Sequence, residues 1–301
     1  MYSVETFSLS KDFGGIKAVR ELELKIEEGE LFSLLGPNGA GKTTTINMLS
    51  CLIKPTSGTA RVMGYDIISE PHKVREVIGV SPQETILSEK LNAWENIYLF
   101  GRAYGISGSE IKRRGLELLE RLGLKERAKD MVKKYSGGMK RRLSIILSLI
   151  HEPSVLFLDE PTLGFDPQAR RAIWEYIEEM RGRRTILLTT HYMEEAERLS
   201  DRVGIMDEGR VIALGTPSEL KRIYGGEGVL RISVRGEGDM GEIRKRWRVE
   251  EGDGEIRVMG GDFKEVLEAL WLCGFEVISC IKEEPTLEDI FIKLTGKRIR
   301  E

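Results

Sequence analysis

The chain has 301 residues, of which 41% are hydrophobic and 32% charged, a balance typical of a folded globular protein rather than a disordered one. This length is enough for one large domain with a buried core and a smaller second domain. The formal net charge of −3 argues against a strongly basic surface, so no nucleic acid partner is expected. Cys51, Cys273 and Cys280 stand singly, which predicts thiols in a reducing compartment rather than disulfides or a zinc site.

The first part of the chain predicts strands followed by helices. Alternating polar and apolar residues at 2–9 and 19–26 predict half-buried antiparallel strands joined through a Gly-rich turn. A short apolar strand is expected at 31–35, and a helix from about 41 to 52. Residues 92–149 are typical mostly of helix.

The middle of the chain predicts a parallel sheet. Two apolar strands are expected at 155–158 and 185–190, with a helix at 167–180 between them. Strand, helix and strand in this order indicate a parallel sheet covered by helices. The segments 202–206 and 210–214 predict a terminal hairpin.

A change in composition at residues 224–228 predicts a linker. Beyond it we expect strands at 229–234, 255–259 and 275–281 and helices at 263–273 and from 287 onward. The predicted domains are therefore 1–222, with a helical subdomain at about 86–150, and a small α+β domain at 228–301.

The strongest motif is a phosphate-binding loop between the strand at 31–35 and the helix that follows it. It consists of Gly36, Pro37, Asn38, Gly39, Ala40, Gly41, Lys42 and Thr43, and the predicted ATP-binding set also includes Thr44. Glycines allow the turn that points backbone N–H groups at a phosphate, and the helix adds the positive end of its dipole. Lys42 is expected to neutralise the β- and γ-phosphates, and the Thr43 hydroxyl to bind Mg²⁺.

Two acids end the apolar strand at 155–158. A buried strand would deliver Asp159 to the carboxyl edge of the sheet, where its carboxylate can hold Mg²⁺. Glu160 can then polarise the attacking water as general base. Alone, such a strand more often leads into a solvated turn; the phosphate-binding loop favours the catalytic interpretation.

His191 closes the strand at 185–190, at the same predicted edge of the sheet. A solitary histidine is more often structural. In a nucleotide hydrolase, a histidine at this position can contact the γ-phosphate, so His191 is a catalytic candidate.

Ser136, Gly137 and Gly138 precede an apolar helix and predict a second anion site, since the N–H groups and dipole of a helix start again face outward. One nucleotide needs one phosphate cradle. The second cradle therefore suggests a nucleotide held by another copy of the chain. The alternative is an ordinary serine cap in a Gly-rich turn.

With these motifs, residues 2 to about 220 resemble the ATP-binding subunits of ABC transporters. The resemblance implies that Gln83 contacts Mg²⁺ and the catalytic water and senses a membrane partner, and that Asp166 couples the two sites of a dimer. It also implies that Phe13 stacks on adenine, although a core aromatic remains the alternative.

The sequence departs slightly from the family pattern. Tyr135 and Met139 flank the second cradle where Leu and Gln are usual, and Phe165 stands where Leu is usual. Residues 284–291 are similar to the ATPase subunits of daunorubicin-resistance-type exporters, which work with a separate permease of the ABC-2 type. A generic amphipathic helix is the competing explanation for that segment.

The resemblance implies a P-loop α/β domain with a parallel core sheet, an antiparallel β subdomain and a helical subdomain. It also implies an ATPase with ATP and Mg²⁺, acting as a homodimer beneath a transmembrane permease at the cytoplasmic face of the membrane. The apolar run 143–150 is too short to cross a bilayer, so another chain is expected to do so. The alternatives are a cassette ATPase that acts on ribosomes or DNA and a regulatory nucleotide switch.

Overall fold

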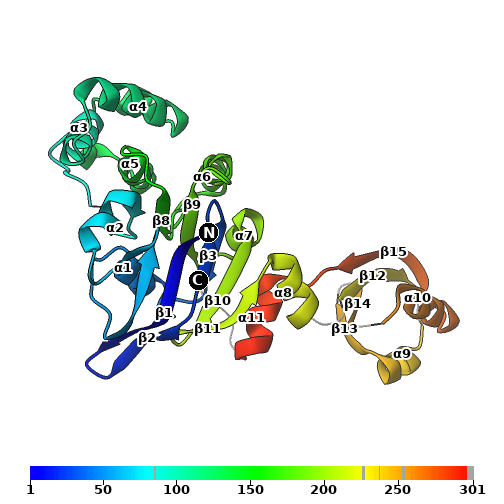
Figure 1. The fold of residues 1–301 in the computed structure, drawn as a ribbon. Coiled ribbons are helices and arrows are strands. Elements are labelled where there is room, and N and C mark those ends of the chain that lie inside the picture. Colours follow the sequence, from blue (N-terminus) through cyan, green and yellow to red (C-terminus); the bar gives the residue numbers. More distant parts are fainter. Residues whose placement is uncertain (85, 226–227, 237, 253–254, 260, 297–301) are drawn as a thin grey trace. The chain divides into compact units, whose positions relative to one another are not determined.

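The computed structural model describes residues 1–84, 86–225, 228–236, 238–252, 255–259 and 261–296 (Figure 1). The described residues form two compact units, Met1–Thr216 and a second unit that begins at Pro217. The division falls before the linker expected at 224–228, because α8 (Pro217–Tyr224) packs against α11 (Leu287–Thr295) of the second unit. Residues 226 and 227 of that linker, and 297–301 at the end of the predicted second domain, lie outside the described residues.

A largely parallel sheet forms the centre of the first unit. Across the described residues its order is β11 (Arg210–Gly215), β10 (Arg202–Asp207), β4 (Leu31–Leu35), β9 (Thr185–Thr190), β8 (Val155–Asp159) and β7 (Ile78–Ser81). Every pair of neighbours is parallel except the β10–β11 hairpin. This arrangement confirms the predicted parallel core and its terminal hairpin.

Side chains of the central strands alternate between two cores. In β8, Leu156 and Leu158 pack with α5 (Gly137–Leu149) and α6 (Pro167–Glu179) on one face. Val155 and Phe157 pack on the other face with α1 (Lys42–Leu49) and with residues of the second sheet. Burial on both faces explains why these strands are continuously apolar.

The second sheet of this unit is antiparallel. It contains, among the described residues, β1 (Tyr2–Phe13), β2 (Ile16–Leu22), β3 (Lys25–Glu27), β5 (Ser57–Val62) and β6 (Tyr65–Asp66). β1 pairs with β2, β3 and β5, as expected for the alternating pattern at the start of the chain. The predicted antiparallel β subdomain is thereby confirmed.

Helices form an arm beside the sheet. α3 (Ala93–Ala103) and α4 (Gly108–Arg121) lie side by side, and α5 contacts both of them as well as β7 (Figure 1). A capping box between Asn92 and Glu95 begins α3, and the side chain of Ser107 caps α4. The first unit also contains α2 (Pro71–Val77), α7 (Met193–Leu199) and the 3₁₀ turns Lys125–Arg127 and Val132–Lys134.

The second unit is an α+β structure with its own core. Its described strands run in the order β13 (Arg248–Gly252), β14 (Glu255–Met259), β12 (Val229–Arg235) and β15 (Glu276–Glu283), all antiparallel. α9 (Gly241–Arg246) and α10 (Phe263–Leu272) supply residues to the same core. Asp262 caps α10, and a capping box of Thr286 and Asp289 begins α11. In the described part of the chain no helix combines the length and apolarity needed to cross a membrane.

Candidate functional site

At two positions of the loop between β4 and α1, only glycine fits beside the neighbouring backbone. A Cβ atom on Gly36 would lie 2.1 Å from the carbonyl oxygen of Met206 in β10. Gly41 has φ +106°, and a Cβ there would lie 2.3 Å from the carbonyl oxygen of Ala18. The backbone therefore passes closely between β2 and β10 before α1 begins at Lys42.

Lys42 points back into its own loop. Its side chain is only 5% exposed, and Nζ donates to the carbonyl oxygens of Gly36 (2.6 Å) and Pro37 (3.1 Å). The same ammonium lies 3.2 Å from Oε1 of Glu160. The loop thus holds a buried positive charge beside the start of a helix, which suits phosphate binding.

Thr43 and Asp159 meet at the carboxyl edge of the parallel sheet. The Thr43 hydroxyl donates to Oδ1 of Asp159 at 3.1 Å, and Thr189 at the end of β9 donates to the same oxygen. Hydroxyl and carboxylate oxygens are ligands that Mg²⁺ prefers, usually together with water and substrate phosphates. The pair fits an Mg²⁺ site completed by a nucleotide.

Glu160 follows β8 in a strained conformation with φ 52°. Its N–H donates to the backbone oxygen and the hydroxyl oxygen of Thr189, both at 3.1 Å. Its Oε2 pairs with Nδ1 of His191 at 2.8 Å. Burial by itself raises the pKa of Glu160, but the His191 bond and the Lys42 charge outweigh it and hold this pKa below its ordinary value. The carboxylate is therefore ionised and oriented.

These residues border a pocket of about 420 Å³. Phe13, Ala18, Pro37, Asn38, Gly39, Ala40, Gly41, Lys42, Thr43, Thr44, Gln83 and Glu160 line it. The ring of Phe13 is 50% exposed, so it is no core aromatic, and Nζ of Lys11 lies 5.0 Å from its centroid. Gln83 is also exposed. Asp159 and His191 are not lining residues themselves, but each contacts one: Asp159 accepts a hydrogen bond from Thr43, and His191 pairs with Glu160.

Other predicted site residues lie at the starts of helices. The Ser136 side chain caps α5 by accepting from N of Met139 (3.3 Å), and Asp166 caps α6 by accepting from N of Ala169 (2.9 Å). Gly138 lies against the ring of Phe165, since a Cβ there would be 3.2 Å from Cε1. The described residues that line the pocket do not include Ser136, Gly137, Gly138 or Asp166.

Three buried residues beside the site were not predicted from the sequence. Thr189 bonds to both Asp159 and Glu160. Glu195 accepts from Thr162 (2.7 Å) and Trp174 (2.8 Å), and burial raises its pKa. Arg141 of α5 is buried, and its Nε donates to the carbonyl oxygen of Pro161, the residue after Glu160. Arg141 is the middle one of three consecutive basic residues near the start of α5, and the sequence does not distinguish it from Lys140 and Arg142.

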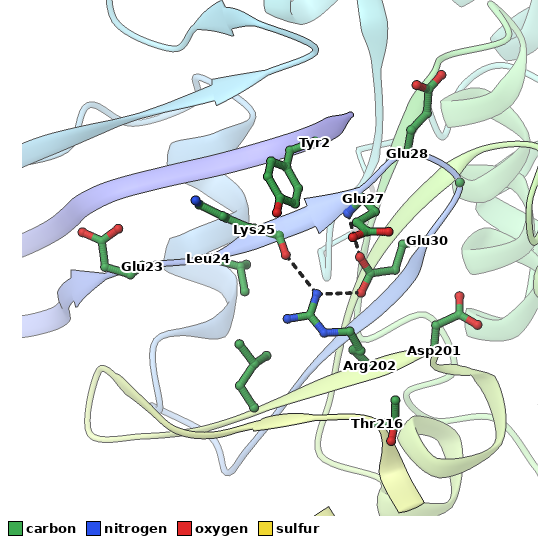
Figure 2. A pocket seen from close by; sticks show the side chains of 12 residues that line it. Tyr2, Glu23, Leu24, Lys25, Glu27, Glu28, Glu30, Asp201, Arg202 and Thr216 are labelled. Carbon is green, nitrogen blue, oxygen red and sulfur yellow. Dashed lines mark hydrogen bonds and ion pairs between the residues drawn. The ribbon is translucent and has the colours of Figure 1, made fainter. Parts of the chain in front are cut away.

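A larger pocket, of about 730 Å³, lies elsewhere on the first unit (Figure 2). Glu23, Glu27, Glu28, Glu30 and Asp201 give it an acidic lining. Figure 2 shows Arg202 bonded to the carbonyl oxygen of Lys25 and the carboxylate of Glu30, so its charge is compensated. Such a lining repels a triphosphate, and the candidate site is therefore the smaller pocket at the phosphate-binding loop.

Comparison with known proteins agrees with this geometry. The chain matches the ABC transporter family over residues 19–163. It is 39% identical to the linearmycin resistance ATP-binding protein LnrL of Bacillus subtilis (strain 168), over 98% of both chains. The chain belongs to the ATP-binding proteins of ABC transporters. It is also 38% identical to the daunorubicin/doxorubicin resistance ATP-binding protein DrrA of Streptomyces peucetius, over 98% of this chain and 92% of that one.

Solved structures of this family share the fold of the first unit. A dimeric ATP-binding cassette in a post-hydrolysis state, bound to ADP and Pi, matches with a TM-score of 0.66 at 29% identity, over 71% of this chain and 98% of the other. The chain is accordingly an ATPase that powers an ABC transporter. This membership favours transport over action on ribosomes or DNA and over a regulatory switch.

Proposed function

We propose that this chain binds Mg-ATP in the pocket at the phosphate-binding loop and hydrolyses it with Glu160 as general base. Lys42 and the loop N–H groups would hold the phosphates, and Phe13 the adenine. Thr43, Asp159 and Gln83 would hold Mg²⁺, which neutralises phosphate charge. The observation that carries this proposal is the position of the Glu160 carboxylate, with Oε1 3.2 Å from Nζ of Lys42 and Oε2 2.8 Å from Nδ1 of His191.

The active form would be a head-to-tail homodimer that encloses two nucleotides. Ser136, Gly137 and Gly138 start a helix outside the pocket of their own chain, which suits a phosphate contact across the dimer. Asp166, at the start of α6, would couple the two sites. A related cassette is dimeric when bound to ADP and Pi, which supports this arrangement.

A separate permease would dock in a groove of about 250 Å³ between the end of α1, α3 and α5. Its lining is mainly apolar and includes Leu52, Ile86, Phe100, Tyr104 and Leu147. Pro82, beside Gln83, belongs to the same lining, so a partner seated there would contact the segment that reaches the nucleotide. This continuity favours the groove as the route by which hydrolysis drives transport.

The transporter is proposed to be an exporter, with this chain at the cytoplasmic face of the membrane. Relatives along almost the whole chain are ATP-binding proteins named for resistance to linearmycin and to daunorubicin or doxorubicin. Resistance by transport requires movement out of the cell. The cargo would be selected by the permease.

The test is the variant Glu160→Gln, which keeps the size of the side chain and removes its basicity. We expect ATP hydrolysis to fall by about 10²–10⁴-fold, the range for losing a general base, while ATP-dependent dimerisation persists. Hydrolysis and sedimentation are measured on the same purified protein.

The control is Glu194→Gln, an acid-to-amide change outside the pocket. Its rate should match the unaltered chain. A Glu160→Gln protein that hydrolyses ATP at the original rate would remove Glu160 from the proposed role.

A further inference from the structure

Arg141 is a buried cation whose hydrogen bonds, within the part of the chain that the structure describes, go to backbone carbonyls. It lies in the second turn of α5, and its side chain is only 5% exposed. The guanidinium donates to four carbonyl oxygens: Nη1 to Pro82 and Gln83 (3.2 Å), Nη2 to Asp159, and Nε to Pro161 (3.3 Å). A planar fork of five donors suits this arrangement, and the three donors of a lysine on a flexible stem do not.

The four carbonyls belong to the two segments that matter most for the proposed chemistry. Pro82 and Gln83 form the segment that reaches the nucleotide pocket beside the groove. Asp159 and Pro161 flank Glu160 on either side. Burial lowers the pKa of Arg141 to about 10, which leaves the guanidinium charged at neutral pH. One cation therefore ties both segments to α5.

We infer that Arg141 is a positioning residue for hydrolysis, one that holds Gln83 and Glu160 in register with the start of α5 in the same chain. That helix start carries Ser136, Gly137 and Gly138. The inference rests on the proposed function, in which these three residues contact the nucleotide of the partner chain. Arg141 then links the phosphate contact in one site of the dimer to the base of the other site.

The alternative is that Arg141 stabilises the fold alone. Arg141→Lys keeps the charge and loses the fork, and the neighbouring Arg142→Lys is the matched control. Arg142 is half-buried and its Nη1 donates to the carbonyl oxygen of Leu122 in the helical arm (3.3 Å). The measurements are kcat and KM for ATP, ATP-dependent dimerisation by sedimentation, and thermal unfolding.

For Arg141→Lys we expect kcat to fall about 10- to 100-fold, the range for losing a residue that orients the ligands of a metal site, here Gln83 and Asp159. KM should stay within about twofold and dimerisation should persist, because Arg141 makes no hydrogen bond to Phe13, Lys42 or Thr43, which would hold the nucleotide itself. Arg142→Lys should retain the original kcat. Arg141→Gln, which keeps two donors, serves as a second variant if Arg141→Lys does not fold.

Three results would overturn the inference: equal kcat for the Arg141 and Arg142 variants, loss of ATP-dependent dimerisation in Arg141→Lys, or loss of the fold in both Arg141 variants. The last two would assign Arg141 to the shape of α5 or to the fold. The proposed function itself is tested separately with Lys42→Ala. If that variant hydrolyses ATP at the original rate, the proposed function is wrong, independently of the results for Arg141.

Discussion

Glu160 combines a strained backbone, an ion pair and a histidine contact at one residue. Its φ of 52° is unfavourable for a side chain of this size, and such strain persists where the surroundings fix it. Thr189 fixes it here through two bonds to its N–H group. The carboxylate is thereby aimed at the pocket before any substrate binds, which is the preorganisation that lowers a reaction barrier.

The contact with His191 predicts a change in pH dependence. Burial raises the pKa of Glu160, and the His191 bond is the largest of the effects that lower it. In His191→Ala this pKa should rise, so the base becomes protonated at higher pH. We expect the acid limb of the kcat/KM profile for ATP to move to higher pH, together with a lower maximal rate. An acid limb at the original pH would contradict this role of His191.

At the scale of elements, the loop before α1 depends on Gly36 for space rather than for a left-handed backbone. A methyl group there would meet the backbone of β10, which cannot retreat without disturbing the sheet. We expect Gly36→Ala to lower the free energy of unfolding by about 1–3 kcal/mol and to weaken ATP binding by the monomer. Denaturant unfolding and nucleotide titration measure the two effects.

The matched control is Gly137→Ala at the start of α5. Apart from its chain neighbours and the nearby backbone of α5 itself, a Cβ atom on Gly137 meets no described atom within 4 Å, and alanine favours the helix. Its stability and its ATP affinity as a monomer should match or exceed those of the unaltered chain. Equal effects of the two substitutions would contradict the steric account of the loop.

The sequence predicts elements well where periodicity is strong and poorly where elements are short. Strands at 31–35, 155–158 and 185–190 are apolar throughout and were predicted close to their observed bounds. β7 was missed because its four residues include Gly79 and Ser81, and α9 because it is short and highly charged. Contacts with distant parts of the chain stabilise such segments; β7, for example, pairs with β8. A local sequence pattern does not reveal those contacts.

The same contrast holds for the site. Motif residues such as Lys42, Thr43 and Glu160 were predicted because their chemistry appears in contiguous sequence, and the structure brings them together at one pocket. Thr189 and Arg141 were not, since their roles arise from contacts between segments far apart in the chain. No spacing rule identifies an arginine that bonds to four carbonyls.

At the scale of the whole molecule, all the pocket residues lie in the first unit, Met1–Thr216. The second unit has a separate core that includes Leu230, Ile232, Val258 and Leu270. We propose that nucleotide chemistry belongs to the first unit and that the second is an accessory domain. The proposed permease groove also lies in the first unit, so transport would be driven from there.

The most direct test of this account is purification of the tagged chain from detergent-solubilised membranes of its own host, with identification of the proteins that accompany it. We predict that a multi-span membrane protein accompanies the unaltered chain in matching amount. It should no longer accompany the Ile86→Glu variant, which is changed at the groove, and should still accompany the Ile278→Glu variant, which is changed on the second unit. These isoleucines are 72% and 59% exposed, so neither change should disturb a core. Recovery of the unaltered chain without a membrane protein, or equal recovery with both variants, would contradict the account.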